Sequence, residues 1–180
     1  EAIIKYDGFA NNLVIGTSGQ ANAIVIPRDS GYVTMPNQPA FLATANGSLQ
    51  SNVGLAETVN FGTEVFDQNN DYNASTSTFT APVTGRYYFS GSVRTGEIDR
   101  DASYYRIELI TANRTYKFAL IDTGKLYSAD PLYHPLSFSG LADMDAGDSA
   151  YISFVRQGGA STADISGAAE YTFFSGHLVC

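Results

Sequence analysis

Residues 61–89, FGTEVFDQNNDYNASTSTFTAPVTGRYYF, decide the fold of this chain. Large aromatic residues recur through the stretch, separated by short polar runs that are rich in turn-forming residues. They are Phe61, Phe66, Tyr72, Phe79, Tyr87 and Phe89. Pro82 and Gly85 mark a corner, and after it Tyr87, Phe89 and Val93 fall on one face of an extended segment. The stretch therefore predicts a strand, a tight corner and a second strand whose inner face is aromatic.

The composition favours an all-β protein. The chain has 180 residues, 44% of them hydrophobic, with 12 Tyr, 11 Phe and no Trp. Turn formers are plentiful and runs of strong helix formers are rare, which is typical of short strands joined by turns. The formal net charge is −8, so nucleic acid and anionic membrane surfaces are poor partners. No apolar run approaches the length of a membrane span, so we expect no membrane insertion.

The single cysteine, Cys180, is the last residue, so no internal disulfide can form. The core must therefore be large enough to fold without a covalent staple. The thiol is interpreted as incidental, and the alternative is a covalent link between chains. Because the sequence begins at Glu1, we expect it to be a fragment or a processed form.

Short strands and turns continue on both sides of the aromatic stretch. Tyr105, Ile107 and Leu109 alternate with polar residues, which predicts a half-buried strand. A return strand follows, on which Tyr116, Phe118 and Leu120 alternate. The other predicted strands span residues 41–45, 58–66, 85–93, 136–144, 151–155 and 171–179. This number of strands, with turns at this spacing, predicts a sandwich or a jelly roll.

Residues 1–35 have a different pattern. Three units, starting at Ala2, Leu13 and Ile24, each consist of an apolar triplet followed by a turn that ends in Gly. Such units are stabilised by stacking or by pairing with copies in partner chains. The alternative interpretation is an ordinary β-hairpin with one extra strand. Pro36 and Pro39 stiffen the connector that follows, so we divide the chain into residues 1–35 and residues 36–180.

The spacing of the aromatic stretch resembles the signature of the complement C1q globular-head family, which has the tumour-necrosis-factor-like jelly roll. The matching positions are Phe61, Asp67, Tyr72, Phe79, Gly85, Tyr87 and Phe89. The family pattern usually ends with one more aromatic residue, and here that position is Gly91. The resemblance extends to 39–41, 141–154 and 174–178, and so covers residues 36–180.

The resemblance implies an all-β, two-sheet jelly-roll sandwich that assembles as a compact homotrimer. It also implies that the strand from Gly85 and the closing strand from Tyr171 lie in the inner sheet. The side chains expected to serve the core or the trimer interface are Tyr87, Phe89, Phe174 and Leu178. Fold alone leaves the function open, because members include recognition heads, secreted ligands and viral surface proteins.

A second resemblance concerns the N-terminal segment. Animal members usually carry a collagen-like stalk, whereas residues 12–19 and 31–41 look like the end of a bacteriophage fibre shaft running into a tip domain. The junction is similar to structural proteins of tailed phages from marine hosts. This implies a virion fibre tip that joins other virion proteins through its shaft and binds a bacterial surface receptor, with a glycan favoured. The alternatives are a structural or head-decoration fibre protein, a secreted extracellular module of a cell, and a fibre-tip hydrolase.

The sequence has little that points to catalysis. His134 and His177 are not spaced for zinc, and no nucleophile elbow, phosphate loop or dinucleotide fingerprint is present, so we expect no enzyme and no cofactor. Three clustered aspartates, Asp143, Asp145 and Asp148, suit either a calcium site or an Asp/Gly turn, and we favour the turn. The glycosylation sequons at Asn46, Asn73 and Asn113 have meaning only in a secreted eukaryotic protein.

Recognition residues are expected in the loops, which a rigid sandwich displays at its ends. Tyrosines beside charged groups suit sugar binding, because their rings stack on sugars while the charged groups hydrogen-bond to hydroxyls. The candidate receptor-binding residues are Arg94, Asp99, Arg100, Tyr127, Tyr133 and His134.

Overall fold

The computed structural model divides into two compact units, Glu1–Pro39 and Ala40–Cys180. It describes residues 1–160 and 162–180, with the side chains of residues 20–22 left out. The elements are β1 (Ala2–Asp7), β2 (Asn12–Thr17), β3 (Gln20–Pro27), β4 (Ala40–Thr44), β5 (Ala56–Thr58), β6 (Thr63–Asp67), β7 (Tyr72–Asn73), β8 (Thr78–Thr80), β9 (Gly85–Gly96), β10 (Ala102–Thr111), β11 (Thr115–Ile121), α1 (Thr123–Leu126), β12 (Tyr133–Met144), β13 (Ser149–Gly158), β14 (Asp164–Ile165) and β15 (Phe173–Leu178). No helix in the described part of the chain is long and apolar enough to cross a bilayer.

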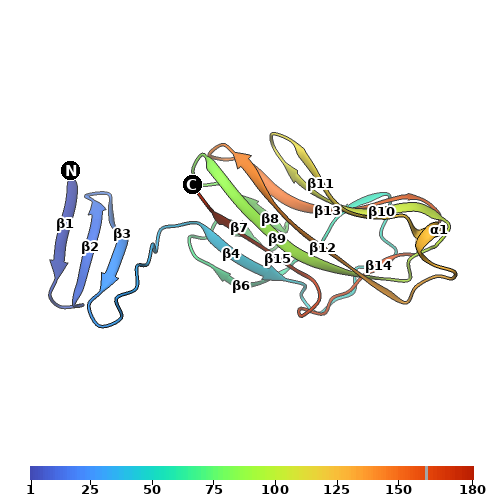
Figure 1. Cartoon of the computed structure of the whole chain (residues 1–180), viewed down its shortest axis with the longest axis horizontal. Coiled ribbons are helices and arrows are strands. Elements are labelled where there is room, and N and C mark those ends of the chain that lie inside the picture. Colours follow the sequence, from blue (N-terminus) through green and yellow to red (C-terminus); the bar gives the residue numbers. More distant parts are fainter. Residues whose placement is uncertain (161) are drawn as a thin grey trace. The chain divides into compact units, whose positions relative to one another are not determined.

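The larger unit is a sandwich of two antiparallel sheets (Figure 1). One sheet, here named the inner sheet after the resemblance, has the order β12-β9-β15-β4-β6, and β14 also pairs with β9. The outer sheet has the order β11-β10-β13-β8-β7, and β5 also pairs with β13. The predicted two-sheet jelly roll is confirmed. The strand from Gly85, β9, and the closing strand, β15, are neighbours in one sheet.

The space between the sheets is filled mainly by aromatic rings. Phe41 stacks on Tyr72 with ring centroids 4.7 Å apart, and on Phe79 with centroids 5.1 Å apart. Phe174 lies 5.7 Å from Phe89 in the same cluster. Such pairs add about 0.5–1.5 kcal/mol each beyond the burial of apolar area. The aromatic stretch therefore builds the core, with one exception: Phe66, on the edge strand β6, is 50% exposed.

Gly91 explains the departure from the family pattern. It points to the core side of β9 and lies opposite Phe138 of β12. A Cβ atom at Gly91 would meet the Phe138 ring, with Cε1 at only 2.9 Å. The Phe173 carbonyl oxygen of β15, on the other side of β9, would lie still closer. Glycine is therefore required by the close approach of both the β15 backbone and the Phe138 ring.

The predicted strand 58–66 is wrong, because the chain changes sheets within it. β5 pairs with β13 of the outer sheet, whereas β6 pairs with β4 of the inner sheet. Between them Phe61 is completely buried, and its N–H donates to the Ser77 hydroxyl at 2.8 Å. The segment that buries this ring leads from β5 in the outer sheet to β6 in the inner sheet. One continuous strand would have remained in a single sheet.

The alternation predicted for the return strand ends before Leu120. Tyr116 and Phe118 pack against the core, but Leu120 is 55% exposed and Ile121 is 5% exposed. The register between β10 and β11 shifts by a bulge between Arg106 and Glu108. A shift of one residue turns every following side chain to the other face, so Leu120 points outward.

The smaller unit is an antiparallel sheet of three strands in the order β1-β2-β3 (Figure 1). Each predicted apolar triplet lies in one strand, and the segment after β3 adds an isolated bridge between Val25 and Thr34. Within one chain the sheet is a hairpin with an extra strand, as the alternative interpretation had it.

Candidate functional site

The six candidate receptor residues come from neighbouring segments at the α1 end of the sandwich (Figure 1). The prediction that they lie in loops is wrong for three of them, because Arg94 is in β9 and Tyr133 and His134 are in β12. This end carries the loop after β9, the segment between β11 and β12, and the segment before β14. Arg100 ties the first two together: its N–H donates to Asp130 Oδ1 at 2.9 Å and its Nη1 donates to the Ser128 carbonyl at 2.8 Å. The loops therefore form one connected surface.

Asp99 shapes the loop after β9. Its carboxylate accepts hydrogen bonds from the backbone N–H groups of Ala160 and Asp101, and these bonds hold the pKa of Asp99 below its usual value. The Asp99 N–H donates to the Tyr105 hydroxyl at 3.1 Å. Asp99 and Arg100 are thus engaged in holding loops in place, and neither lines the cavities described next.

Arg94 is held between two tyrosine rings. Its guanidinium carbon lies 3.8 Å from the ring centroid of Tyr171 and 4.8 Å from that of Tyr133. Nη2 donates to the Ser166 hydroxyl at 2.8 Å, and the buried Nε has no hydrogen-bond partner among the described residues. The tyrosines remain open to solvent, with Tyr133 58% and Tyr171 45% exposed. Cation–π contact orients the guanidinium while leaving aromatic surface available.

A cavity of about 210 Å³ opens beside Arg94, and we call it the polar cavity after the charged and hydroxyl side chains that stand in its otherwise largely apolar lining. It is lined by Leu49, Arg94, Gly96, Glu97, Leu132, Tyr133, Asp164 and Ser166. A second hollow of about 340 Å³ shares Glu97 and Leu132 with it and adds Asp130, Pro131 and Thr162. Glu97 has a φ of +51°, a left-handed conformation that is uncommon outside glycine and that costs free energy. The two hollows combine hydroxyl, carboxylate, guanidinium and aromatic groups around a strained residue.

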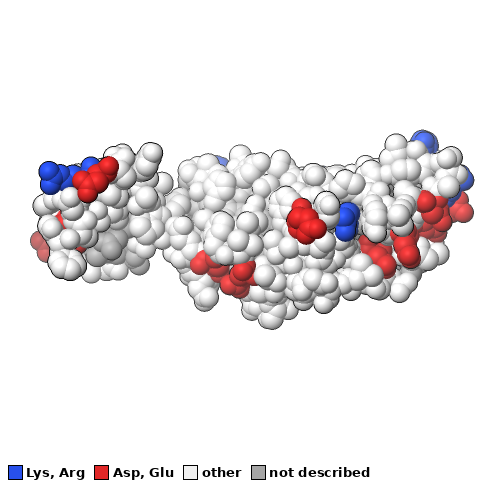
Figure 2. All heavy atoms as spheres, turned by 90° about the horizontal axis from the view of Figure 1, so that it is seen from below, with Lys and Arg blue, Asp and Glu red and all other residues white. Residues whose placement is uncertain are grey.

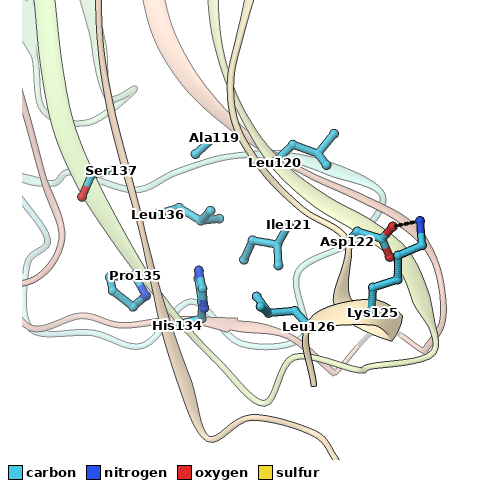
Figure 3. Close-up of a pocket in the computed structure, with 10 residues that line it drawn as sticks. All are labelled: Ala119, Leu120, Ile121, Asp122, Lys125, Leu126, His134, Pro135, Leu136 and Ser137. Atoms are coloured by element: carbon cyan, nitrogen blue, oxygen red, sulfur yellow. Dashed lines mark ion pairs between the residues drawn. The ribbon is translucent and has the colours of Figure 1, made fainter. Parts of the chain in front are cut away.

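An apolar groove of about 480 Å³ lies between β11, α1 and β12 (Figure 3). Its walls are mostly apolar, formed by Ala119, Leu120, Ile121, Leu126, Pro135 and Leu136. His134 lies on one wall with Leu126 reaching toward it, and Asp122 pairs with Lys125 at 2.7 Å on the rim. The Tyr127 hydroxyl hydrogen-bonds to His134 Nδ1. Burial lowers the pKa of His134 and raises the pKa of Tyr127, so both are neutral near pH 7.

The structure thus brings the candidate residues together in two separate pairs. Arg94 and Tyr133 meet at the polar cavity, whereas Tyr127 and His134 meet at the apolar groove. Carboxylates dominate this end: Glu97, Asp99, Asp101, Asp122, Asp130 and Asp164 accompany Arg94, Arg100 and Lys125. Figure 2 shows this acidic cluster at the right-hand end.

Sequence reasoning left out several lining residues of the polar cavity. Asp164 and Ser166 come from around β14, which pairs with the end of β9 through Asp164 and Gly96. Ser166 lies 72 positions from Arg94 in the sequence, and Tyr171 is also distant. No local pattern signals such a contact, although Glu97 lies between the candidate residues Arg94 and Asp99 in the sequence.

Two of the three clustered aspartates, Asp143 and Asp148, use their carboxylates in contacts within and around the turn after β12, and Asp145 contributes its backbone N–H. Asp143 accepts from Arg114 Nη2 at 3.2 Å and from the Tyr116 hydroxyl at 3.0 Å. Asp148 accepts from Asn113 Nδ2 at 2.8 Å and from the Asp145 N–H at 2.9 Å. Over residues 1–160 and 162–180, no group of three or more His, Cys, Asp or Glu side chains is arranged to hold a metal ion.

The side chains assigned to the core or a trimer interface point between the sheets. Tyr87, Phe89 and Phe174 are completely buried within the single chain. Leu178 is partly buried and packs against the same cluster. Tyr87, Phe89 and Phe174 are therefore not available on the surface of the sandwich, whereas Leu178 keeps part of its side chain exposed.

Comparison with known proteins accounts for most of the chain. The model of the C1q domain family matches residues 40–179, which is the sandwich. The globular domain of zebrafish complement 1qA protein is similar in structure, with a TM-score of 0.57 and 20% identity over 80% of this chain and 98% of that chain. No curated protein sequence matches.

Two further solved structures share the fold. Murine APRIL has a TM-score of 0.57 and 12% identity over 79% of this chain and 100% of its own. The Eiger TNF from S. frugiperda has a TM-score of 0.58 and 11% identity over 79% of this chain and 93% of its own. At these identities the likeness establishes the architecture, and the function has to be argued from the residues.

Proposed function

We propose that this chain, which belongs to the C1q domain family, is the homotrimeric tip of a tailed-bacteriophage fibre. Members of the family form trimers and act as non-catalytic recognition or signalling modules. In this proposal it resides in the virion and binds a glycan on the bacterial surface without catalysis. The observation that carries the glycan assignment is the Arg94 guanidinium held between two solvent-exposed tyrosines beside a carboxylate-lined cavity.

The chemistry of the polar cavity fits a sugar. The rings of Tyr133 and Tyr171 offer apolar surface for the C–H face of a pyranose, and Glu97 and Asp164 can accept hydrogen bonds from its hydroxyls. Arg94 supplies donors whose direction is fixed by the flanking rings. Concave sites with a few convergent polar groups are the usual form of small-ligand sites. One cavity per protomer, repeated in a trimer, would multiply a weak affinity through effective concentration.

The phage setting is supported by the N-terminal unit. A sheet of short strand-turn units, followed by the connector that contains Pro36 and Pro39, stands where animal members usually carry collagen-like repeats. In the proposal, residues 1–35 are the end of a fibre shaft and attach the tip to other virion proteins.

The apolar groove is assigned a different role, as a contact for a neighbouring protomer. Leu120 and Leu126 are 55% and 58% exposed on its walls, and apolar surface of this kind is suited to a protein partner. This assignment leaves the polar cavity free for the receptor. It moves Tyr127 and His134 from the receptor contact to the vicinity of the groove.

Glycan binding can be tested with the intact trimer on an array of bacterial surface polysaccharides. Replacing Tyr133 with Ala should reduce binding by about tenfold or more, because the stacking surface and one wall of the cavity are lost. Tyr32→Ala is the matched control, since Tyr32 is 75% exposed in the smaller unit. Binding that is equally strong in both variants, or absent for the unmodified protein, would contradict the glycan site. Capture of virion proteins alone would then favour a structural or head-decoration fibre.

A secreted cellular recognition or signalling module is the second candidate. It is favoured by the origin of the similar structures, which are a zebrafish complement protein, murine APRIL and an insect TNF. The genomic sequence upstream of Glu1 discriminates between the two. Further strand-turn repeats support the fibre, whereas a collagen-like stalk or a signal peptide supports the secreted module.

A further inference from the structure

The sheet of the smaller unit has one face made of apolar side chains. In the register of β1 and β2, Ile4 lies opposite Ile15, and Tyr6 lies opposite Leu13. Each of these pairs extends onto β3, where Ile24 lies opposite Ile15 and Ile26 lies opposite Leu13, so that the sheet has two rows of apolar residues. Residues that face each other across antiparallel strands, and residues two apart along a strand, share a face of the sheet. We call this set the isoleucine face: Ile4, Tyr6, Leu13, Ile15, Ile24 and Ile26.

On β1 and β2 the isoleucine face is exposed to solvent in the single chain, whereas Ile24 and Ile26 of β3 are half-buried. Ile4 is 75% exposed, Tyr6 58%, Leu13 39% and Ile15 36%. Among the described hydrophobic side chains of the three strands only Val14 is buried, and it points to the opposite face. A two-row apolar surface of this kind is not left in water by a stable soluble protein.

The charges of the sheet avoid this face. Lys5 lies opposite Val14 and Asp7 opposite Asn12, so both alternate onto the other side. The isoleucine face therefore has neither charge nor strong hydrogen-bonding groups, apart from the Tyr6 hydroxyl, and it is complementary to a copy of itself. Branched aliphatic side chains on a pleated surface pack well against each other.

The smaller unit has only 39 residues, Glu1–Pro39. This small size indicates that the isoleucine face is an interface that the sheet needs for its stability. A chain of about 40 residues without disulfides or metals rarely buries enough apolar area to fold alone. Three strands with one bare hydrophobic face need a second layer to be stable. The layer has to come from other copies or another protein.

We propose that the isoleucine face packs against the same face of two other copies of this chain, so that three sheets enclose one apolar core. The proposal rests on the trimer of the proposed function, because a trimeric jelly roll holds three copies of the adjoining sheet at high effective concentration. Edge-to-edge pairing of strands from different copies would satisfy backbone groups but leave the isoleucine face in water. Face-to-face packing is the arrangement that removes it from solvent.

Cysteine crosslinking of the full chain tests the arrangement directly. Ile15 lies in the central strand of the face, so Ile15→Cys in a Cys180→Ser background should form intermolecular disulfides on mild oxidation. The Cys180→Ser change is needed because Cys180 is a free, exposed thiol. Lys5→Cys, on the opposite face of the sheet, is the matched control and should remain mostly uncrosslinked. Equal crosslinking of both variants, or none at Ile15, would overturn the proposal.

Hydrogen exchange of the full chain supplies the second measurement. Ile15→Asp should increase exchange of the β2 amides by about tenfold or more, because a charge in the apolar core opens the sheet, whereas Lys5→Asp should not. Light scattering of the same samples separates the two proposals. A trimer whose β2 amides exchange equally in both variants refutes only the sheet packing, whereas a monomer at every concentration refutes the trimer itself.

Discussion

The jelly roll and the N-terminal sheet of this chain remove apolar surface from water in different ways. In the jelly roll, Phe41, Phe79, Phe89 and Phe174 are 0–1% exposed within one chain. In the N-terminal sheet, Ile4 and Tyr6 are more than half exposed. The jelly roll has two facing sheets and so completes its own core, whereas the N-terminal sheet leaves the apolar side chains that β1 and β2 contribute to the isoleucine face exposed. The comparison shows that a segment can form β-strands without burying enough apolar surface to be stable within one chain. This chain contains one unit that is stable by itself and one that is not.

The largest expected effect comes from separating the two units. Residues 40–180 alone should keep β-sheet structure and unfold cooperatively, because their core is internal. Residues 1–39 alone should show no stable sheet at micromolar concentration. Far-UV circular dichroism and amide NMR spectra of both fragments check this. A monomeric 1–39 fragment with protected amides would remove the contrast between the units.

A substitution in the aromatic core tests whether the jelly roll is stabilised by a core within one chain. Phe174 has ring centroids 5.0 Å from Phe41 and 5.5 Å from Phe61, so Phe174→Ala should lower the free energy of unfolding by about 3–5 kcal/mol. The measurement is chemical denaturation of residues 40–180. In the full chain, Ile4→Ala should leave the midpoint of the jelly roll unchanged, and a comparable loss there would show that the two units share one core.

Glycine substitutions sharpen the contrast in packing density. A Cβ atom at Gly176 would lie 2.6 Å from Phe89 Cδ1 and 2.8 Å from Phe41 Cε1, so Gly176→Ala should cost about 1–3 kcal/mol of stability. A Cβ atom at Gly19, in the turn between β2 and β3 of the N-terminal sheet, has no neighbour within 4 Å. Gly19→Ala is therefore expected to be close to neutral. Thermal unfolding of the two variants gives the comparison, and equal effects would contradict it.

The smallest expected effect is a pH dependence at the apolar groove. Burial lowers the folded-state pKa of His134 below its ordinary value of 6.5. Between the two pKa values the unfolded chain binds more protons, so stability falls as pH decreases from 7 toward the folded-state pKa and changes no further below it. Partial exposure keeps the effect under about 1 kcal/mol. His134→Gln should flatten this slope in denaturation curves from pH 7 to pH 5, whereas His177→Gln should retain it.

The sequence predicted those parts of the molecule that local alternation determines. Tyr105, Ile107 and Leu109 all face the core, because residue spacing encodes the face of a strand. It could not predict that residues 58–66 change sheets, since the alternation is the same in either sheet. Nor does it show the bulge that turns Leu120 outward, because the bulge depends on a register set by β10.

The residues of the candidate site also divide into those that the local sequence indicates and those that depend on contacts between distant segments. Arg94 and Tyr133 were identified from loop composition, and they meet in the structure because β9 and β12 are paired neighbours. Tyr171 and Ser166 complete the surroundings of Arg94 through a contact between segments far apart in the sequence. A single sequence contains no local signal for such a contact.

The close approach of Phe138 to Gly91 has a consequence for the history of the family. A side chain at Gly91 would meet both the Phe138 ring and the Phe173 carbonyl oxygen, so a ring there requires a small residue at position 138 and a shift of the β15 backbone. Relatives with an aromatic residue at the position of Gly91 should therefore have a small residue opposite it. A protein in which only one of the two positions has changed would have either two rings or no ring in this part of the core. Both states are destabilising, so natural selection tends to remove them. The pair is expected to change together and rarely, and it can mark which lineages of this jelly roll share a recent ancestor.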